Sequence, residues 1–349
     1  MPPKAKPSSS SGKSSGKSGG KAEDEIENNR KAIRKFLKTY EKSCQDKSLV
    51  PLPSVAQKLN RLVKSEEGPT TLNIPFLITE ELSLEAVQAL IESLDSSIQG
   101  YEKVSFWRNN LSDKTVQLIG KWLQPHPQLK ELEIIDNRVG PKGCQAISRA
   151  LQHNETLTYL NLDHNELGDE GASALAVGLS WSPSLIKVSL NYCGIEEEGA
   201  VSLANEAIAK STSLQILEMQ GNSIGDRGFD AIGQALARSQ KLQTLNLSGC
   251  NEGLPLKTDV VSRMCDSIKQ NPNNALQNLD LNYVTVEPEA VLMFAELAKQ
   301  KENILRIRLY ERVDKIAYKE LTTQLGTNLK NFIQKNKPKK KKKAKKKDK

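Results

Sequence analysis

The sequence predicts an α/β fold: a right-handed solenoid, or horseshoe, with parallel strands on its concave face and helices on its convex face. The first observation is a motif, Leu-x-x-Leu-x-Leu-x-x-Asn/Cys-x-Leu, that recurs at a nearly constant interval from about residue 69 to residue 310. The second is that the apolar spacing within each copy changes from that of a strand to that of a helix. Because a solenoid grows by adding copies, the 349 residues can form one array instead of two ordinary domains.

Eight copies share the first apolar position of the motif, and most intervals between these positions are equal. The interval from Leu185 to Leu214 is one residue longer, and the interval from Leu242 to Leu276 is the longest. The longest one has extra residues around 252–259, which predict either a loop at the rim or a contact specific to a partner. An eroded copy, visible in Leu72, Ile74 and Leu77, precedes the eight. The first positions are Tyr101, Leu129, Leu157, Leu185, Leu214, Leu242, Leu276 and Ile304.

In the cleanest copy, residues 157–162 have the period of a short strand and residues 169–179 have the period of a helix. Gly168 and Gly171 lie where the chain turns into the helix, at a place where backbones approach closely. Strand and helix in every copy make the sheet parallel. The residues expected in the core of this copy are Leu157, Leu160, Leu162, Leu167, Ala172, Leu175, Ala176 and Leu179.

An asparagine follows the strand in several copies, where its amide can bond backbone groups that the turn leaves open. These residues are Asn109, Asn137, Asn165 and Asn222, and cysteine takes the same place at Cys193 and Cys250.

The regular unit, with its full helix, resembles the ribonuclease-inhibitor-like class of leucine-rich repeats (LRR). This class also includes the repeats of NOD-like receptors, the GTPase-activating protein of Ran, and tropomodulin. The resemblance covers about two-thirds of the chain and implies the horseshoe fold. It implies no reaction, because members of the class share a scaffold and differ in function.

Five segments are predicted. Residues 1–21 form a disordered tail rich in Lys, Ser and Gly, and residues 22–68 form a helical N-terminal cap. The solenoid covers residues 69–312, a C-terminal helical cap covers 313–334, and a disordered poly-lysine tail covers 335–349. Caps are expected because the end of a solenoid otherwise exposes its core.

The caps are inferred from apolar residues at helical spacing. A first helix over residues 22–43 and a second after Pro53 are expected in the N-terminal cap, and a closing helix in the C-terminal cap. The residues that indicate them are Ile26, Ile33, Phe36, Leu37 and Tyr40; Val55, Leu59, Leu62 and Val63; and Ile316, Leu321, Leu325, Leu329 and Phe332.

The net charge of +8 is unevenly distributed. Residues 1–21 carry five lysines and no acid, and residues 335–349 carry eleven lysines and one acid. The two ends therefore supply +15, and the body between them has −7. The basic pI describes the ends and gives no sign of a basic groove.

No enzyme, cofactor or metal site is predicted. His126 and His153 occupy matching places before a strand, and His164 follows Asp163 without a third ligand or a nucleophile. The glycines follow the repeat, so none forms a phosphate-binding loop.

Five cysteines without CxxC spacing indicate free thiols in a reducing compartment. We see no signal peptide and no stretch of eighteen apolar residues, and we expect a cytoplasmic protein. The cilium, including its axoneme, and the nucleus are the alternatives. The cysteines are Cys44, Cys144, Cys193, Cys250 and Cys265.

The residues between the core positions of each strand are predicted to face the hollow and to bind a protein partner. Large aromatic and apolar side chains among polar and charged ones are typical of interface hot spots. Ordinary strand propensity is the alternative reason for their presence. The acidic residues suggest a partner with basic character. The predicted binding residues are Trp107, Arg108, Glu133, Ile135, Asp136, Tyr159, Asp163, Tyr192, Ile216 and Glu218.

The lysine run near the end of the sequence has no aromatic residue and therefore cannot read bases. It predicts a solubilising tail, a nuclear import signal, or electrostatic docking to an acidic polymer such as tubulin tails or RNA. No lipid-modification motif or amphipathic anchor accompanies the run, so we expect no membrane partner. The residues are Lys339, Lys340, Lys341, Lys342, Lys343, Lys345, Lys346 and Lys347.

The sequence thus predicts a non-enzymatic scaffold or adaptor that is monomeric, binds a protein on its concave face and uses basic tails for docking or targeting. One alternative is a GTPase-regulating protein of the Ran-activator type, in which Arg108 would act. The other is a nuclear RNA-associated factor.

Overall fold

The computed structural model describes residues 19–65, 80–97, 101–124, 128–251, 255–310 and 313–337, without the side chains of residues 19–22. The chain divides into two compact units. The first comprises residues 1–76 and 85–102, and the second comprises residues 77–84 and 103–349. The eroded repeat expected around Leu72, Ile74 and Leu77 lies outside the described residues.

The first unit is helical where it is described, with α1 (Gly19–Asp46), α2 (Pro53–Lys64) and α3 (Leu84–Ser97). Its core includes Phe36 and Tyr40, whose rings stack with centroids 5.7 Å apart. The Tyr40 hydroxyl accepts a hydrogen bond from the backbone N–H of Leu52 at 3.2 Å, just before α2 begins. Both helices expected from the spacing are therefore present, and the role of this unit as a cap stays a prediction.

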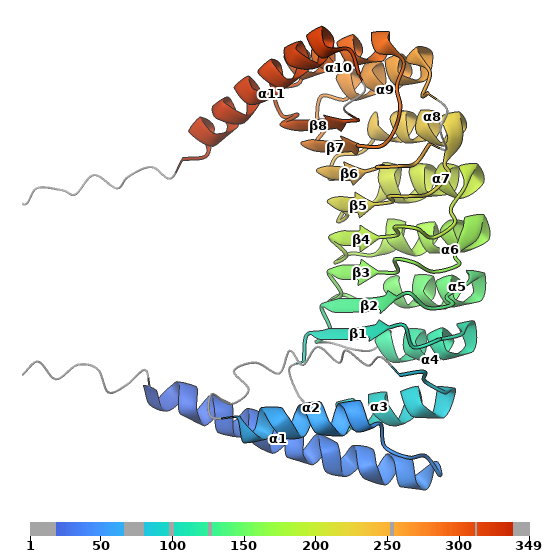
Figure 1. Ribbon diagram of the computed structural model, residues 1–349, viewed down its shortest axis with the longest axis vertical. Helices are drawn as coiled ribbons and strands as arrows, with labels where there is room; N and C mark the ends of the chain where they lie inside the picture. The colour runs from blue at the N-terminus through green and yellow to red at the C-terminus, as the bar shows by residue number, and fades with distance from the viewer. Residues whose placement is uncertain are drawn as a thin grey trace, which may run out of the picture. The chain divides into compact units, whose positions relative to one another are not determined.

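The second unit contains one parallel sheet of eight strands in sequence order, with each strand paired to the next (Figure 1). The register repeats from pair to pair, so that Val104 aligns with Leu132 and Leu132 with Leu160. The strands are β1 (Lys103–Trp107), β2 (Glu131–Ile135), β3 (Tyr159–Asn161), β4 (Lys187–Ser189), β5 (Ile216–Glu218), β6 (Thr244–Asn246), β7 (Asn278–Leu281) and β8 (Arg306–Leu309).

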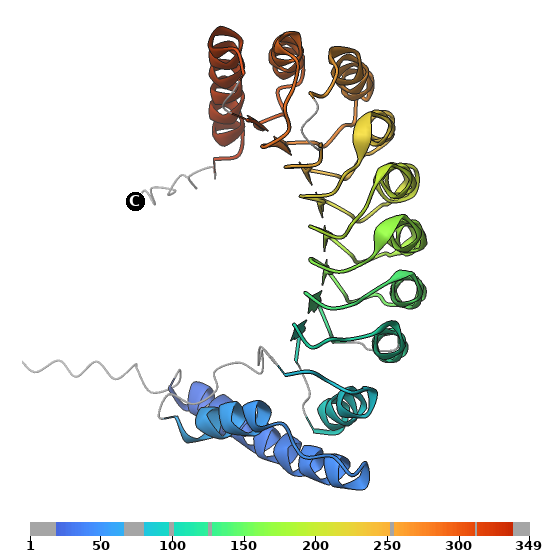
Figure 2. The ribbon, with the colours of Figure 1, turned by 45° about the vertical axis from the view of Figure 1, so that its right-hand side comes forward.

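A helix follows every strand, and in this unit the strands line the inner side of the curve while the helices line the outer side (Figure 2). This arrangement confirms the predicted α/β solenoid. The helices are α4 (Asp113–Leu123), α5 (Pro141–Leu151), α6 (Gly168–Trp181), α7 (Glu197–Leu203) with the π-helical turn η1 (Ala204–Ile208), α8 (Gly225–Leu236), α9 (Thr258–Gln270), α10 (Pro288–Gln300) and α11 (Lys315–Lys335).

The buried asparagines satisfy the turns that follow the strands. The side-chain Oδ1 of Asn137 accepts from the backbone N–H groups of Asn109 and Leu111, each at 3.0 Å, and its Nδ2 donates to the carbonyl of Phe106 at 3.1 Å. Asn165 repeats this arrangement one copy later. These asparagine hydrogen bonds therefore tie each of these turns to the preceding repeat and satisfy the backbone groups that the turn exposes.

Cysteine supplies part of the same bonding where it replaces asparagine. The thiol of Cys193 donates to the carbonyl of Leu162 at 3.2 Å, and the thiol of Cys250 donates to the carbonyl of Met219 at 3.0 Å. Burial raises the pKa of both thiols to about 12, so they keep the proton that they donate at neutral pH. This is a structural role for the two cysteines.

The two irregular repeat intervals have separate structural solutions. The interval from Leu185 to Leu214 contains one extra residue, and η1 absorbs it as a wider turn at the end of α7. The longest interval, from Leu242 to Leu276, is accommodated partly before α9, where Leu256 is buried and pairs with Val286. Residues 252–254 lie outside the described part of the chain.

The closing helix is present as α11, but only some of its apolar residues are buried. Leu321 and Leu325 are buried against the last repeat as expected. Ile316, Leu329 and Phe332, which also indicated this helix, are exposed, and the role of the helix as a cap stays a prediction. The spacing of apolar residues identifies the helix, but it does not show where the preceding repeat stops covering it.

Candidate functional site

The concave face of the sheet is the candidate site, because its strands present every second side chain away from the core. In β2 the pattern is regular: Leu132 and Ile134 are fully buried, while Glu131, Glu133 and Ile135 are half-buried on the other side. The predicted residues on this face are Trp107, Glu133, Ile135, Tyr159, Ile216 and Glu218.

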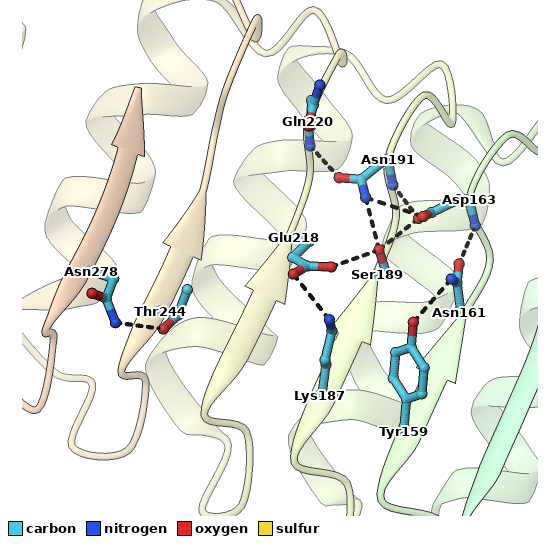
Figure 3. Close-up of polar contacts among 10 residues, drawn as sticks. All are labelled: Tyr159, Asn161, Asp163, Lys187, Ser189, Asn191, Glu218, Gln220, Thr244 and Asn278. Carbon is cyan, nitrogen blue, oxygen red and sulfur yellow. Dashed lines mark hydrogen bonds and ion pairs between the residues drawn. The ribbon is translucent and has the colours of Figure 1, made fainter. Parts of the chain in front are cut away.

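A hydrogen-bonded network crosses β3, β4 and β5 (Figure 3). One carboxylate oxygen of Asp163 accepts from the Ser189 hydroxyl at 2.7 Å and from the backbone N–H of Asn191 at 2.8 Å. The other accepts from Nδ2 of Asn191 at 3.1 Å. The Asn191 side chain also accepts from the backbone N–H of Gln220 at 2.7 Å. The network therefore fixes three successive repeats relative to one another.

Glu218 and Tyr159 extend this network along the strands. Glu218 forms an ion pair with Lys187 at 3.1 Å, and one of its carboxylate oxygens lies 3.1 Å from the Ser189 hydroxyl oxygen. The Lys187 ammonium lies 5.1 Å from the centre of the Tyr159 ring, within the range of a cation–π contact. Burial raises the pKa of Tyr159, and the carboxylates of Glu133, Asp163 and Glu218 raise it further. Tyr159 therefore keeps its phenolic proton at neutral pH.

Ion pairs also bridge β1 and β2. Lys103 bonds Glu133 at 2.6 Å and Glu131 at 3.2 Å. Burial alone would lower the pKa of Lys103, but the two carboxylates outweigh it and the pKa is raised. Beyond the strand ends, Arg108 pairs with Asp136 at 2.8 Å.

The acidic side chains of the concave face are therefore occupied within the chain. Each has a cation or a hydrogen-bond donor from a neighbouring repeat. Such pairing weakens the attraction that a basic partner would feel, because a new cation must compete with one already in place. The acidic residues are Glu131, Glu133, Asp136, Asp163, Glu218 and Asp280, the last of which pairs with Arg308.

A second feature lies at the carboxyl ends of the strands, in residues that adopt a left-handed backbone. Their φ angles lie between +53° and +70°, a region that glycine enters freely and that larger residues enter at a cost of about 1–3 kcal/mol. We call this set the strand-end row: Arg108, Asp136, His164, Tyr192, Gly221, Gly249 and Tyr283.

Aromatic rings of the strand-end row lie against one another. The rings of His164 and Tyr192 stack with centroids 4.8 Å apart and an angle of 12°. The Tyr192 ring also lies over Gly221, where an added Cβ would be only 2.2 Å from a ring carbon. Its hydroxyl accepts from Nε2 of Gln220 at 2.8 Å. The Tyr192 ring is thus held flat along the row on both sides.

Farther along, Tyr283 lies next to Tyr310, with ring centroids 5.5 Å apart. Tyr283 is 62% exposed, and Tyr192 is also exposed. Gly221 and Gly249 lie between these aromatic residues in the row, and a Cβ at Gly249 would meet nothing within 4 Å. The row therefore has aromatic residues on both sides of a two-glycine interval.

Sequence reasoning did not single out His164 for binding, nor Tyr283 and Tyr310. The available signal was the repeat itself, since Tyr283 occupies the same place as Gly221 and Gly249 in other copies. A large residue at a position where glycine also occurs can indicate a left-handed backbone. The predicted targeting lysines, Lys339 to Lys347, lie outside the described residues.

The described histidines and cysteines assemble no metal centre: within the described residues, no group of three or more potential ligands is close enough to hold an ion. The His164 ring is engaged in stacking, and His153 is exposed in the turn that follows α5. His126 lies outside the described part of the chain. All five cysteines are free and buried.

Comparison with known proteins agrees with this geometry. A family model described as Leucine Rich repeat matches residues 126–148, 153–176, 182–204 and 210–233. The solenoid is built of leucine-rich repeats. The matches cover the central copies, and the flanking copies of the leucine-rich-repeat solenoid follow from the same register and the same sheet. The ribonuclease-inhibitor-like subtype stays a prediction.

Three solved structures align with this leucine-rich-repeat chain. One chain of a yeast Rad7 and Elc1 complex aligns with a TM-score of 0.52 and 14% identity, over 90% of this chain and 79% of that chain. Actin-Binding Site 2 of leiomodin-1 aligns at 0.31 and 12% identity, over 64% of this chain and 90% of that chain. The tropomodulin C-terminal domain of Caenorhabditis elegans aligns at 0.35 and 14% identity, over 63% and 96%.

At 14% identity, the alignment with the Rad7 and Elc1 complex supports the fold alone. The other two TM-scores are too low to support a shared fold. A search of curated proteins finds no match to this sequence. Leucine-rich repeats are typical of protein-interaction scaffolds, whose curved inner surface offers an extended binding face. Within the described residues, no helix is long and apolar enough to cross a bilayer.

Proposed function

We propose that this protein is a non-enzymatic scaffold that binds a protein partner on the concave side of its leucine-rich repeats. The binding centre is the strand-end row, flanked by Trp107, Tyr159 and the other predicted strand residues. The observation that carries the proposal is the stacked and left-handed placement of Tyr192 between His164 and Gly221.

The physical argument is preorganisation. An aromatic side chain that is already held in place loses little conformational entropy when a partner covers it. Exposed tyrosines supply large contact areas together with a hydroxyl that can hydrogen bond, and they are frequent among interface hot spots. A strained, left-handed backbone recurs at the same position of several repeats. Strain of this kind is concentrated at functional sites, where it is maintained at a cost in stability.

The charged residues of the face have a different role in this proposal. Because the carboxylates are already paired, they hold the strands in register and exclude partners that bring unpaired charge. A partner with an apolar or aromatic segment and neutral hydrogen-bonding groups suits this face better than a basic one. In the Ran-activator alternative, Arg108 would have to exchange its ion pair with Asp136 for a nucleotide phosphate.

We retain a cytoplasmic monomer as the working prediction. Targeting to the cilium or the nucleus, and docking of the lysine run to tubulin tails or RNA, stay open predictions for residues 339–347.

The test begins with partners identified by proximity labelling, followed by affinity measurement with purified proteins. Replacing Tyr192 and Tyr283 with alanine should weaken binding at least about tenfold, while the circular dichroism spectrum stays unchanged. A matched control is Trp181→Ala on α6, because Trp181 is 72% exposed but lies on the helical side of the solenoid. Equal loss in the control, or unchanged affinity in the double variant, would contradict the proposal.

A further inference from the structure

Helix α11 extends past the end of the helix that supports it. Asn328 marks that point, because its Nδ2 donates to the carbonyl of Ala298 near the end of α10 at 2.8 Å and to the carbonyl of Ile304 at 2.9 Å. In an earlier repeat, Asn271 bonds the carbonyl of Leu236 in the same manner, and α9 ends immediately before it. By contrast, α11 continues from Asn328 to Lys335, which is about two further turns.

These two turns expose apolar side chains. Leu329 is 44% exposed, Phe332 is 37% exposed and Ile333 is 50% exposed. They are spaced three and four residues apart, so they are neighbours on one side of the helix. In the supported part of the same helix, Leu321 and Leu325 are buried. We call Leu329, Phe332 and Ile333 the α11 apolar cluster.

Positive charge surrounds this cluster in the helix and in the sequence that follows it. Lys330 and Lys335 lie within the same two turns, and Lys337 follows the helix. From residue 321 to residue 349 the sequence holds twelve lysines and a single acid, Asp348. Lys335 pairs with Glu302 at 2.9 Å, on the exposed surface of both side chains.

We propose that the α11 apolar cluster and the lysines beside it, Lys330, Lys335 and Lys337, form a docking element for anionic lipid bilayers, to which the later lysines of the sequence add positive charge. The apolar side chains would enter the boundary between headgroups and acyl chains, about 5–10 Å deep, while the lysines contact acidic headgroups. A short amphipathic surface with adjacent lysines combines two signals, apolar insertion and positive charge, as stable attachment to a bilayer requires. This inference is independent of the proposed partner on the concave face.

The chemistry favours a bilayer over the other candidate surfaces. An RNA backbone or an acidic tubulin tail would use the lysines but gain little from aliphatic side chains. A second copy of this chain could cover the apolar cluster, but it would bring a second set of lysines close to the first. An anionic bilayer uses the apolar surface and the positive charge at the same time.

Taken alone, the lysine run does not predict membrane binding, because no amphipathic anchor is evident beside it in the sequence. The exposed end of α11 supplies one. The anchor lies on the surface of the bilayer and does not cross it, in keeping with the lack of a spanning helix in the described part of the chain.

The experiment is flotation of the full-length chain with vesicles of phosphatidylcholine and phosphatidylserine in equal parts, and with vesicles of phosphatidylcholine alone. The main variant is Leu329→Gln, Phe332→Gln and Ile333→Gln together, which keeps every lysine and changes exposed positions. Val177→Gln with Trp181→Gln is the matched control, because these exposed apolar residues on α6 have no lysine run nearby in the sequence.

We expect binding to the anionic vesicles, weakened about a hundredfold by the triple glutamine variant and unchanged in the α6 control. Replacing Lys339 to Lys343 with glutamine should weaken binding about fivefold per lysine, and added salt should act in the same direction. Vesicles of phosphatidylcholine alone should leave the chain unbound.

An independent readout is selective labelling of an introduced cysteine, which is feasible because all the native cysteines are buried. An Ile333→Cys variant can therefore be labelled selectively with a polarity-sensitive dye, whose emission should shift to the blue on anionic vesicles. Vesicle binding that is equal in the triple variant, or a dye that stays in water, would overturn the proposal in favour of lysine contacts alone. Capture by RNA or polyglutamate without vesicle binding would overturn it in favour of an acidic polymer.

Discussion

The concave strand face and the end of α11 both expose apolar and charged side chains, but they organise them in opposite ways. On the strand face, Lys103, Asp163 and Tyr192 are each engaged by neighbouring repeats. At the end of α11, Leu329, Phe332 and Ile333 extend beyond the last supporting helix and remain partly exposed. The difference indicates that a paired surface selects its partner by shape, whereas an unpaired amphipathic surface responds to area and charge.

The largest expected effect comes from displacing one ring of the strand face. Gly221→Ala would place a Cβ 2.2 Å from a Tyr192 ring carbon, on a backbone with a φ of +70°. We expect a loss of about 2–3 kcal/mol in the free energy of unfolding, together with a loss of partner affinity as large as that of removing the Tyr192 ring. Denaturant unfolding and binding measurements test this.

Gly249→Ala is the matched control for this prediction. Its φ of +62° imposes nearly the same backbone strain, but an added Cβ meets nothing within 4 Å. We expect about 1 kcal/mol of destabilisation and unchanged affinity. If both variants lose affinity equally, backbone strain and not the position of the Tyr192 ring would be responsible.

A smaller effect concerns the ion pairs of the strand face. Lys103 is about a third exposed and its pKa is raised by Glu133 and Glu131, so replacing it with methionine should remove about 1 kcal/mol of stability at neutral pH. A raised folded-state pKa stabilises fully below the unfolded value near 10.5, and this stabilisation is lost as the pH rises through the folded value.

The difference in unfolding free energy between parent and Lys103→Met should therefore be constant near neutral pH and fall toward zero above about pH 10.5. Comparing the two proteins at each pH removes the contribution of Tyr159, which both retain. A difference that stays constant through this range would mean that packing of the lysine chain, and not its charge, provides the stability.

The smallest expected effect is at the end of α11. The triple glutamine variant of Leu329, Phe332 and Ile333 should change the free energy of unfolding by less than about 0.5 kcal/mol, because exposed side chains contribute little to folding. Leu325→Ala, in the supported part of the same helix, should cost about 2–3 kcal/mol. A large loss in the triple variant would show that the cluster packs within the folded chain, which would remove the contrast between the two surfaces.

Much of the fold could be predicted from periodicity alone. Leu157, Leu160 and Leu162 are all fully buried, as the strand spacing indicated. Cys193 and Cys250 take over asparagine's place in the turn, as the motif allows. Even the slightly longer interval that begins at Leu185 has a simple counterpart, since its one surplus residue becomes the wider turn η1.

The candidate site was less predictable. Sequence spacing placed Glu133 and Asp163 on the concave side but could not show that Lys103 and Asn191 already occupy them. Pairing of this kind depends on which side chains meet across neighbouring strands and in which rotamer. The left-handed backbone of Tyr192 was not predicted either, because its signal is indirect: glycine occupies the same position in two other copies.

The sequence by itself determined the repeat, the parallel sheet and the helix on the outer side of each coil. Those features depend on local periodicity, and a regular spacing of apolar residues encodes them directly. Only the tertiary structure decided which charges neutralise each other and where α11 extends beyond the end of α10. Both depend on contacts between residues about 30 positions apart, such as Asn328 with Ala298, and such contacts exist only once the coils are stacked.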